Sequence, residues 1–203
     1  MNINNIEFSV DSLTKPVVVL IGPPGSGKTE VGRLLAAELD WTFWDTDRLI
    51  EQATGMTIPE IFDHHGEKTL RFLEKKLIAK IDKLNQVLRA TLNFAENTPQ
   101  LSGTVLSTGG GLPIEKENFA VLSRIGTIIS LSATLDVLAQ RALQQGHRPL
   151  LAETDKLSQK SRLELLVKER QPVYKQAQWT IDTSNLAIVE VVEQIKQKLK
   201  DFV

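Results

Sequence analysis

The chain has 203 residues, a formal net charge of −1 and no cysteine, a size that suits one α/β domain around a single core. The near-neutral charge argues against a general nucleic-acid binder, and the absence of cysteine excludes disulfides and thiolate metal sites. No run approaches the roughly 20 apolar residues that span a bilayer, and residues 1–15 lack the pattern of a targeting segment. We therefore expect a cytoplasmic enzyme, monomeric and without nucleic-acid or membrane partners.

The first strong signal is an apolar run, Val17 to Ile21, that leads directly into a glycine-rich loop. The run predicts a buried strand, and residues 22–29 read Gly-Pro-Pro-Gly-Ser-Gly-Lys-Thr, the spacing of a phosphate-binding loop. Its glycines let successive N–H groups face phosphate oxygens, Lys28 can reach the β- and γ-phosphates, and the Thr29 hydroxyl can ligate Mg²⁺. A helix over residues 31–39 would add its N-terminal dipole to the same anion site. The loop predicts binding of a nucleoside triphosphate, with a glycine-rich surface turn as the alternative.

A second strand is expected over residues 41–44, and it ends at two acidic residues, Asp45 and Asp47. In an extended segment, side chains two residues apart point to the same face. The carboxyl ends of parallel strands are where open α/β sheets bind ligands. We therefore expect both carboxylates at the phosphate cleft, one near Mg²⁺ and one accepting the proton of an attacking hydroxyl. The structural alternative is that Asp47 is the N-cap of a short helix starting at Arg48.

The rest of the chain alternates between helical and strand-like segments. Helices are expected at 48–53, 58–64, 135–143, 157–176 and 188–199. A further helix should run from Gly66 onward, because Leu70, Leu73, Leu77 and Ile81 follow at helical spacing. Strands are expected at 105–106, 127–131 and 179–182. Residues 93–103 and 144–156 are rich in turn residues, and we expect the second segment to be a mobile lid. The alternation predicts an α/β fold of the P-loop NTPase class, a three-layer α/β/α arrangement with a five-stranded parallel sheet as in nucleoside monophosphate kinases. One domain would span residues 1–203.

Three consecutive glycines, Gly109, Gly110 and Gly111, follow the expected strand at 105–106. Glycine adopts backbone torsions forbidden to other residues, and it leaves room for a ligand to approach the main chain. The triple glycine therefore predicts a substrate-binding turn, with an ordinary tight turn as the alternative.

Six motifs, in order along the chain, resemble those of the shikimate kinase family. They are the loop at 22–29, Phe43-Trp-Asp-Thr-Asp47, Gly66-Glu67 with Arg71-Phe-Leu-Glu74, Leu106-Ser-Thr-Gly-Gly-Gly111, Arg148-Pro-Leu-Leu151 and Arg170-Gln-Pro-Val-Tyr174. The resemblance covers residues 16 to about 200. It implies ATP-dependent phosphorylation of the 3-hydroxyl of shikimate, which gives shikimate 3-phosphate and ADP on the route to aromatic amino acids. Mg²⁺ would accompany the ATP.

The resemblance also implies roles for single residues. The catalytic group would be Lys28, Asp47 and Arg148, and the magnesium ligands would be Thr29 and Asp45. ATP would be bound by Gly25, Ser26, Gly27, Lys28, Thr29, Glu30, Arg141 and Arg148, and shikimate by Asp47, Arg71, Gly109, Gly110, Gly111 and Arg170. In these assignments Arg148 is the lid arginine that closes on the transferring phosphate, and Arg141 lies near adenine.

Two of the arginines, Arg71 and Arg170, would hold the shikimate carboxylate, because a guanidinium fork matches a carboxylate. Both have simpler alternatives. Arg71 lies three residues before Glu74 and could form an ordinary surface ion pair. Arg170 could be a solvated residue near a helix C-terminus, before Pro172 breaks the helix.

Other polar residues receive no functional role. The adjacent His64 and His65 match no metal-binding motif, so we expect them on the surface. His147 lies beside the lid arginine, but a phosphate contact is not assigned to it. The segment after Asp182 aligns poorly with the family pattern, so no adenine contact is predicted there.

Extra length between Glu74 and Gly109 departs from the family pattern, and we interpret it as a peripheral insertion at about 85–103. Two other functions stay open. Another small-molecule P-loop kinase, such as a gluconate kinase, would not need Arg71 together with the Asp-Thr-Asp strand end and the triple glycine. A non-catalytic relative that binds a partner through the insertion would be expected to have lost a catalytic group.

Overall fold

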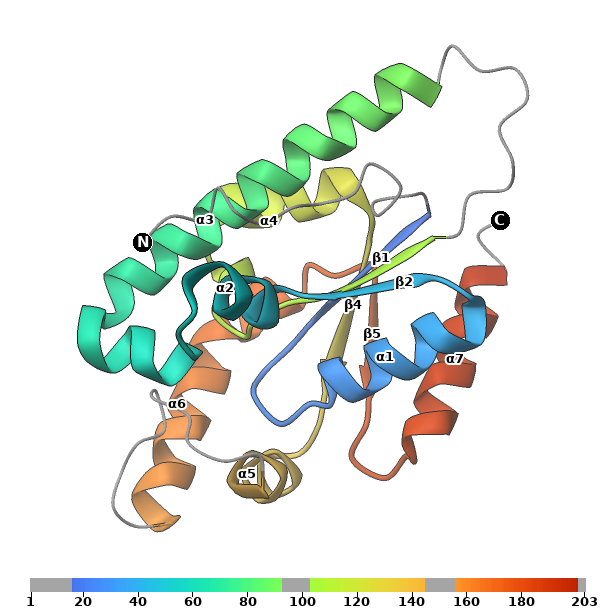
Figure 1. Ribbon diagram of the computed structural model, residues 1–203. Helices are drawn as coiled ribbons and strands as arrows, with labels where there is room; N and C mark the ends of the chain where they lie inside the picture. Colours follow the sequence, from blue (N-terminus) through green and yellow to red (C-terminus); the bar gives the residue numbers. More distant parts are fainter. Residues whose placement is uncertain (1–15, 93–102, 145–155, 201–203) are drawn as a thin grey trace.

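The computed structural model describes residues 16–92, 103–144 and 156–200, and its central feature is a parallel sheet of five strands (Figure 1). The strands are β1 (Val17–Ile21), β2 (Thr42–Asp45), β3 (Thr104–Ser107), β4 (Thr127–Ser132) and β5 (Trp179–Asp182). Their order across the sheet is β2-β3-β1-β4-β5, and all neighbouring pairs are parallel. The predicted sheet is confirmed, and each expected strand ends within a residue or two of its predicted position.

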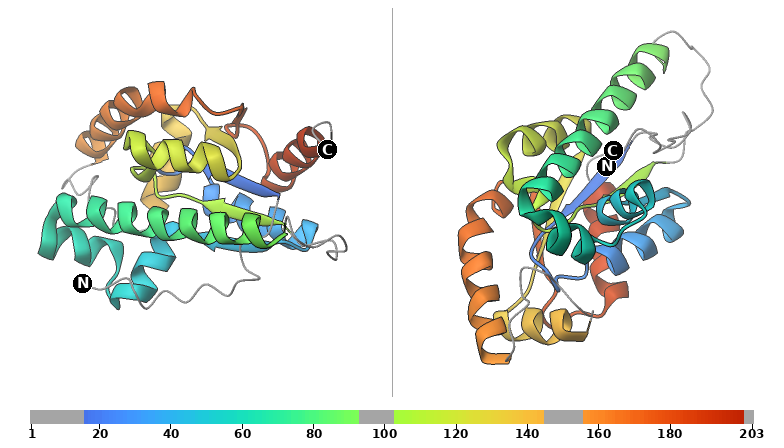
Figure 2. Two further views of the ribbon diagram at one scale, coloured as in Figure 1. Left: turned by 90° about the horizontal axis from the view of Figure 1, so that it is seen from above. Right: turned by 60° about the vertical axis from the view of Figure 1, so that its left-hand side comes forward.

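Helices cover both faces of this sheet. They are α1 (Lys28–Leu39), α2 (Thr46–Thr54), α3 (Ile58–Leu92), α4 (Lys116–Ile125), α5 (Leu135–Gln144), α6 (Lys156–Tyr174) and α7 (Ile188–Lys200), with the short 3₁₀ helix η3 (Leu112–Ile114). α1 and α7 pack on one face, and α3 and α4 cover the other (Figures 1 and 2). The predicted three-layer arrangement is therefore confirmed. Within the described ranges, no helix is long and apolar enough to cross a membrane.

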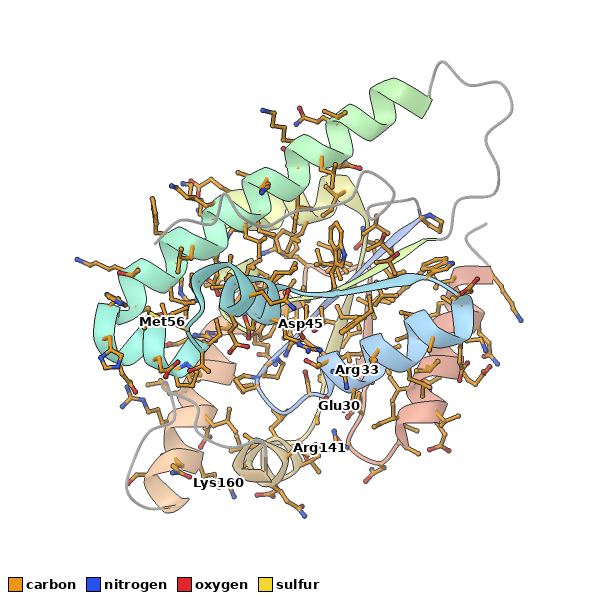
Figure 3. The ribbon with its side chains drawn as sticks, viewed as in Figure 1. Glu30, Arg33, Asp45, Met56, Arg141 and Lys160 are labelled. Atoms are coloured by element: carbon orange, nitrogen blue, oxygen red, sulfur yellow. The ribbon has the colours of Figure 1, made fainter. Side chains whose placement is uncertain are left out.

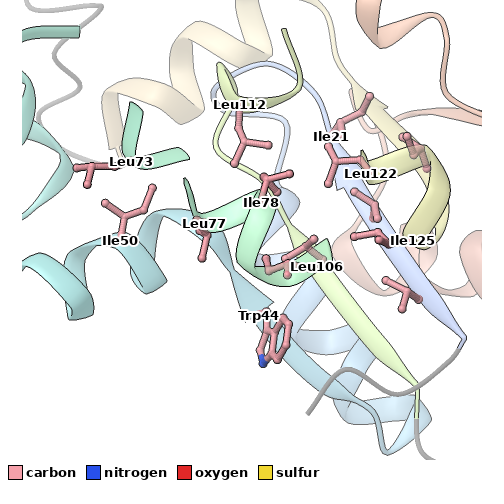
Figure 4. Packing of buried hydrophobic residues seen from close by; sticks show 14 of the residues in the cluster. Ile21, Trp44, Ile50, Leu73, Leu77, Ile78, Leu106, Leu112, Leu122 and Ile125 are labelled. Carbon is pink, nitrogen blue, oxygen red and sulfur yellow. The ribbon is translucent and has the colours of Figure 1, made fainter. Parts of the chain in front are cut away.

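The central strand β1 is buried along its whole length because both of its faces are covered by helices. Its successive side chains alternate between the two layers, as strand geometry requires. Ile21 packs in the cluster that includes α3 and α4, whereas Leu20 packs in the cluster with α1 and α7. Figure 4 shows the first cluster, where Leu77 of α3 and Leu106 of β3 lie among its members. The strand ends thus lie in a rigid core that supports the loops after them.

The long helix α3 consists of two helical parts that meet at a kink. Gly66 has φ 77° and ψ 168°, which is not helical, so the predicted break at this glycine is confirmed. The part after the kink runs to Leu92 and buries Leu77 and Ile81 against the sheet. Residues 93–102, in the expected insertion, and residues 145–155, in the expected lid, lie outside the described residues.

Helices α4 and η3 were not expected from the sequence pattern. In α4 the core-facing positions are Asn118, Leu122 and Ile125, so one of the three carries a polar side chain. Asn118 is buried because its side-chain amide donates to the Leu112 carbonyl oxygen at 3.0 Å. A polar residue at a core position interrupts the apolar pattern by which a helix is recognised in a sequence. The hydrogen-bond partner that allows Asn118 to be buried lies in a different element, η3.

Candidate active site

The loop between β1 and α1 is shaped by its glycines and held by a lysine. Gly25 and Gly27 have φ values of 81° and 90°, a conformation that favours glycine. Lys28 is buried, and its Nζ donates to the carbonyl oxygens of Gly22 at 3.0 Å and Pro23 at 2.9 Å. The N-cap of α1 is Gly27, which has no side chain to occupy the N–H groups of the first turn. The loop therefore presents N–H donors and a cation, as an anion site requires.

Asp45 connects the end of β2 to this loop (Figure 3). Its Oδ2 accepts a hydrogen bond from Thr29 Oγ1 at 2.8 Å. Its Oδ1 accepts from the backbone N–H groups of Asp47 at 3.1 Å and Arg48 at 3.4 Å, so Asp45 is the N-cap of α2. The prediction that Asp47 is this cap is wrong. The prediction that Asp45 and Asp47 lie in one extended segment, with both side chains on the same face, is wrong as well, because the chain turns into a helix at Thr46.

The first turn of α2 nevertheless brings Asp47 to the triple glycine. Thr46 Oγ1 accepts from the Gly109 N–H at 2.9 Å. The Asp47 carboxylate lies so close to Gly109 that a Cβ at this glycine would overlap it. A Cβ at Gly110 would be 3.4 Å from the Gly22 carbonyl oxygen, so the triple glycine also borders the phosphate loop. The fold thus brings together the elements that the sequence assigned to one site.

Arg71 on α3 is held by two carboxylates. Its Nη1 donates to Glu74 Oε2 at 2.6 Å, and its Nη2 and Nε donate to Glu67 Oε1 at 2.8 and 3.2 Å. Glu74 is 2% exposed and Arg71 18% exposed, so the alternative of an ordinary surface ion pair is wrong. These bonds use three of the five N–H donors of the guanidinium. The group lies over Gly111, where a Cβ would overlap it.

The electrostatics of this cluster keep Arg71 charged. Burial raises the pKa of Glu74 above its ordinary value, and the positive charges of Arg71 and Arg170 oppose that rise. Burial disfavours the charge of Arg71, but the carboxylates of Glu74 and Glu67 raise the pKa of Arg71 on balance. A cationic guanidinium is therefore fixed beside the triple glycine.

Arg170 on α6 belongs to the same cluster and is only 8% exposed. The alternative of a solvated residue is therefore wrong. The predicted helix break at Pro172 is also wrong, because α6 continues to Tyr174. Pro172 lies in the last helical turn, and both Pro172 and Lys168, whose carbonyl loses its partner, are exposed to solvent. The proline therefore costs the helix little.

The triple glycine does not use the torsions that favour glycine, because none of its three residues has a positive φ. That part of the prediction is wrong. Its ends are glycines for reasons of space, since a side chain would overlap Asp47 at Gly109 and Arg71 at Gly111. The polar groups that closely approach the main chain of these glycines are the protein's own Asp47 and Arg71 side chains.

Comparisons with known proteins show which family the chain belongs to. The family model described as shikimate kinase matches residues 24–200. This chain belongs to the shikimate kinase family. The shikimate kinase of Caldanaerobacter subterraneus subsp. tengcongensis is 36% identical over 178 residues, which cover 88% of this chain and 92% of the relative. That of Microcystis aeruginosa is 35% identical over 204 residues, 98% of this chain and 95% of the relative.

Solved structures of shikimate kinases also resemble this one. The shikimate kinase from Acinetobacter baumannii in complex with shikimate has a TM-score of 0.77 and 31% identity, over 94% of this chain and 95% of that chain. A deoxyadenosine kinase from M. mycoides with bound dCTP has a TM-score of 0.55 at 12% identity, covering 92% of this chain and all of that chain, so it shares the fold alone. The expected nucleoside-kinase-like class is confirmed.

This shikimate kinase family member has a cleft of about 360 Å³ on the α1 and α7 side of the loop. Its lining includes Gly25, Ser26, Gly27, Glu30, Arg141 and Thr183, together with residues 186–188. Arg141 is fixed there, because its Nη1 donates to Thr183 Oγ1 and its Nη2 to the Thr183 carbonyl oxygen, both at 2.9 Å. Residues 186–188 are apolar lining that the sequence analysis did not assign. An apolar segment between a strand and a helix carries no signal that separates ligand contact from packing.

Some predicted residues cannot be placed. Arg148 and His147 lie outside the described residues. His64 and His65 are exposed on α3, as expected. The described part of the chain holds no group of three or more histidine, cysteine, aspartate and glutamate side chains that could bind a metal.

Tyr174, at the end of α6, should titrate far from the usual range. Burial raises the pKa of Tyr174 to about 12, although the charge of Arg170 acts in the opposite direction. The folded state favours the neutral phenol. The contribution of Tyr174 to the free energy of unfolding is therefore intact below pH 10 and is lost as the pH rises through 12. The loss is about 3 kcal/mol in the free energy of unfolding, at about 1.4 kcal/mol per unit.

This tyrosine is the only one in the chain, so tyrosinate absorbance after a rapid pH jump reports it alone. We expect titration near 12 in the folded protein and near 10 after unfolding in denaturant. Titration near 10 in the folded protein would show that the phenol is solvated.

Proposed function

We propose that this chain phosphorylates the 3-hydroxyl of shikimate with ATP, at the site between the phosphate loop, the start of α2 and the triple glycine. The observation that carries the proposal is the position of Asp47 and Arg71, packed against opposite ends of the same three glycines beside the loop. Shikimate is a small polyol with one carboxylate. The pair would hold such a molecule by its hydroxyls and its carboxylate, with one hydroxyl near the γ-phosphate.

The triphosphate would lie along the loop and the first turn of α1. Gly25, Ser26 and Gly27 supply backbone donors, and Lys28 exchanges its carbonyl partners for phosphate oxygens. The cleft of about 360 Å³ beside Arg141 suits the adenine. Glu30 is exposed in the first turn of α1, at the edge of the same cleft.

Thr29 and Asp45 would hold Mg²⁺, directly or through water, because both present hard oxygen donors at the phosphate end of the loop. One further observation fits a hydrated ion. Ser107 Oγ is buried without a hydrogen-bond partner among the described residues, and Ser107 is paired in register with Asp45. Thr29 and Asp45 would thereby place the positive charge of Mg²⁺ beside the triphosphate, where it would neutralise phosphate charge.

The transfer itself would depend on Asp47 and Arg148. Asp47 accepts a hydrogen bond from the attacking hydroxyl and takes its proton. Lys28 and Arg148 stabilise the charge on the transferring phosphoryl group. Arg148 belongs to the proposed lid at about 144–156, and lid closure would exclude water and so prevent ATP hydrolysis.

The shikimate carboxylate would be held by Arg71 and Arg170. Arg170 is buried and Arg71 half-buried next to the triple glycine, and Arg71 keeps donors beyond those that Glu74 and Glu67 use. Desolvated guanidinium–carboxylate contacts are strong and set orientation as well as affinity. Gly110 has the phosphate loop and Arg170 as neighbours, so the N–H groups of Gly110 and Gly111 would meet the hydroxyls.

A glycine series should separate these roles. Gly111→Ala should push Arg71 out of place and weaken shikimate binding at least tenfold more than Gly110→Ala, because a Cβ at Gly110 makes ordinary contacts of 3.4 Å or more. Gly109→Ala should act on Asp47 and lower turnover instead. The measurement is calorimetric shikimate affinity with steady-state kinetics for the three variants. Equal losses in all three would contradict this division.

The test of the function is a coupled assay of ADP release with MgATP and four acceptor conditions: shikimate, shikimate methyl ester, gluconate and none. We expect turnover with shikimate and a sharp fall with the ester, which lacks the charge that the arginines bind. Turnover with gluconate instead would favour another small-molecule kinase. ATP binding without any turnover would favour a non-catalytic relative.

Four further points stay predictions. They are a cytoplasmic location, a monomeric state, the absence of nucleic-acid partners, and a single domain in which the segment at about 85–103 is an insertion. The described part of that segment is the end of α3, which extends away from the sheet (Figure 2).

A further inference from the structure

The carbonyl groups of the triple glycine are all fixed, whereas two of its N–H groups are open. The carbonyl oxygens of Gly109 and Gly111 accept from N–H groups of the following helix η3 at 3.2 and 3.1 Å. The Gly110 carbonyl oxygen accepts from Tyr174 Oη at 2.8 Å. Among the residues that the structure describes, the N–H groups of Gly110 and Gly111 have no hydrogen-bond partner. Open donors on a fixed backbone suit a ligand with oxygen acceptors.

The contact from Tyr174 differs from the other two because it is not local. It joins residues 64 positions apart, from the end of α6 to the turn after β3. In a trans peptide the C=O and the next N–H point in opposite directions. The bond to the Gly110 carbonyl therefore sets the direction of the Gly111 N–H. Between two glycines such a peptide turns easily when nothing holds it.

Tyr174 also contacts the carboxylate clamp. Tyr174 is 5% exposed, and Arg170, one turn earlier on α6, lies near enough for its positive charge to act on the phenol. The phenol hydroxyl donates to the Gly110 carbonyl oxygen, and a Cβ at Gly110 would lie 3.7 Å from Arg170 Nη1. The Tyr174 hydroxyl thus holds the turn beside one of the arginines proposed to bind the acceptor's carboxylate.

We propose that Tyr174 is a positioning residue, which fixes the Gly110–Gly111 peptide so that the Gly111 N–H points at an oxygen of the acceptor. The proposal rests on the proposed function, since that acceptor is shikimate. Removing the phenol hydroxyl releases the peptide, because it removes the bond to the Gly110 carbonyl oxygen. The packing of the ring is unchanged, because phenylalanine has the same shape.

The test is Tyr174→Phe beside Ser123→Ala as the control. Ser123 Oγ also donates to a backbone carbonyl, that of Phe119 at 3.0 Å, but on the exposed side of α4. We expect Tyr174→Phe to raise KM for shikimate roughly 5- to 10-fold, the value of one hydrogen bond, with KM for ATP unchanged. Ser123→Ala should change neither constant.

A second readout needs no substrate. In the ligand-free protein, the amide NMR signal of Gly111 should shift and broaden in Tyr174→Phe, whereas that of the exposed Gly55 should not. An unchanged Gly111 signal would overturn the positioning role whatever the acceptor is. Lower thermal stability with both KM values unchanged would overturn it as well. Absence of shikimate turnover in the wild type would count against the proposed function alone.

Discussion

Replacing Asp47 with asparagine should lower kcat by about 10²- to 10⁴-fold, the usual contribution of a general base. Asparagine keeps the size of the side chain, and Asp45 rather than Asp47 caps α2, so the helix should start as before. Asp47 lies against Gly109, and Lys28 is held by other groups, so affinity for ATP should stay near the wild-type value. The measurement is kcat for shikimate together with ATP affinity by calorimetry.

Asp136→Asn is a matched control for this variant. Asp136 also lies in the first turn of a helix, α5, and its side chain is 83% exposed. The Asp136→Asn variant should lose at most the small stability contribution of the exposed ion pair between Asp136 and Lys160. If Asp47→Asn turns over as fast as this control, Asp47 takes no part in proton transfer.

Replacing Arg71 with alanine should weaken shikimate binding by roughly 10- to 150-fold, the value of one charge-assisted hydrogen bond, with ATP binding unchanged. The same change leaves Glu74 buried at 2% exposure without its main partner. Stranding a buried charge costs about 3–5 kcal/mol, so the variant should also be less stable. The measurements are shikimate affinity and the free energy of unfolding.

Two further variants separate binding from stability. Arg71→Ala with Glu74→Gln removes the stranded charge, so stability should recover while shikimate binding stays weak. Arg124→Ala removes an arginine from α4 that pairs with Asp82 at 2.6 Å and is half exposed, and it should change neither affinity. Wild-type shikimate affinity in the double variant would remove Arg71 from the clamp.

Features governed by local sequence could be predicted here. The strand and loop over residues 17–29, the break at Gly66 and the Arg71–Glu74 pair all depend on spacing within one segment. Spacing of three residues on a helix brings side chains together wherever the helix lies. It does not reveal burial, and burial is what turns this ion pair from a surface feature into a fixed clamp.

Features governed by packing between segments were missed or misread. The glycines at positions 109 and 111 were attributed to torsion and to room for a ligand, but their φ values are not positive and the space they leave holds groups from α2 and α3. The alternative of a solvated Arg170 rested on its charged sequence neighbours, yet Arg170 is buried beside Gly110. Tyr174 stands in the motif at 170–174, but no role was predicted for it, because its partner is 64 residues away. Only the tertiary fold contains this information.

The most direct test of the central claim is to identify the product. The wild-type protein is incubated with MgATP and shikimate, and the product is analysed by phosphorus–proton correlated NMR. A single phosphorus signal coupled to the proton on carbon 3, with ADP in equal amount, is the predicted result. Phosphate on another hydroxyl, or ADP with free phosphate and unchanged shikimate, would contradict the account of how Asp47, Arg71 and the triple glycine orient the acceptor.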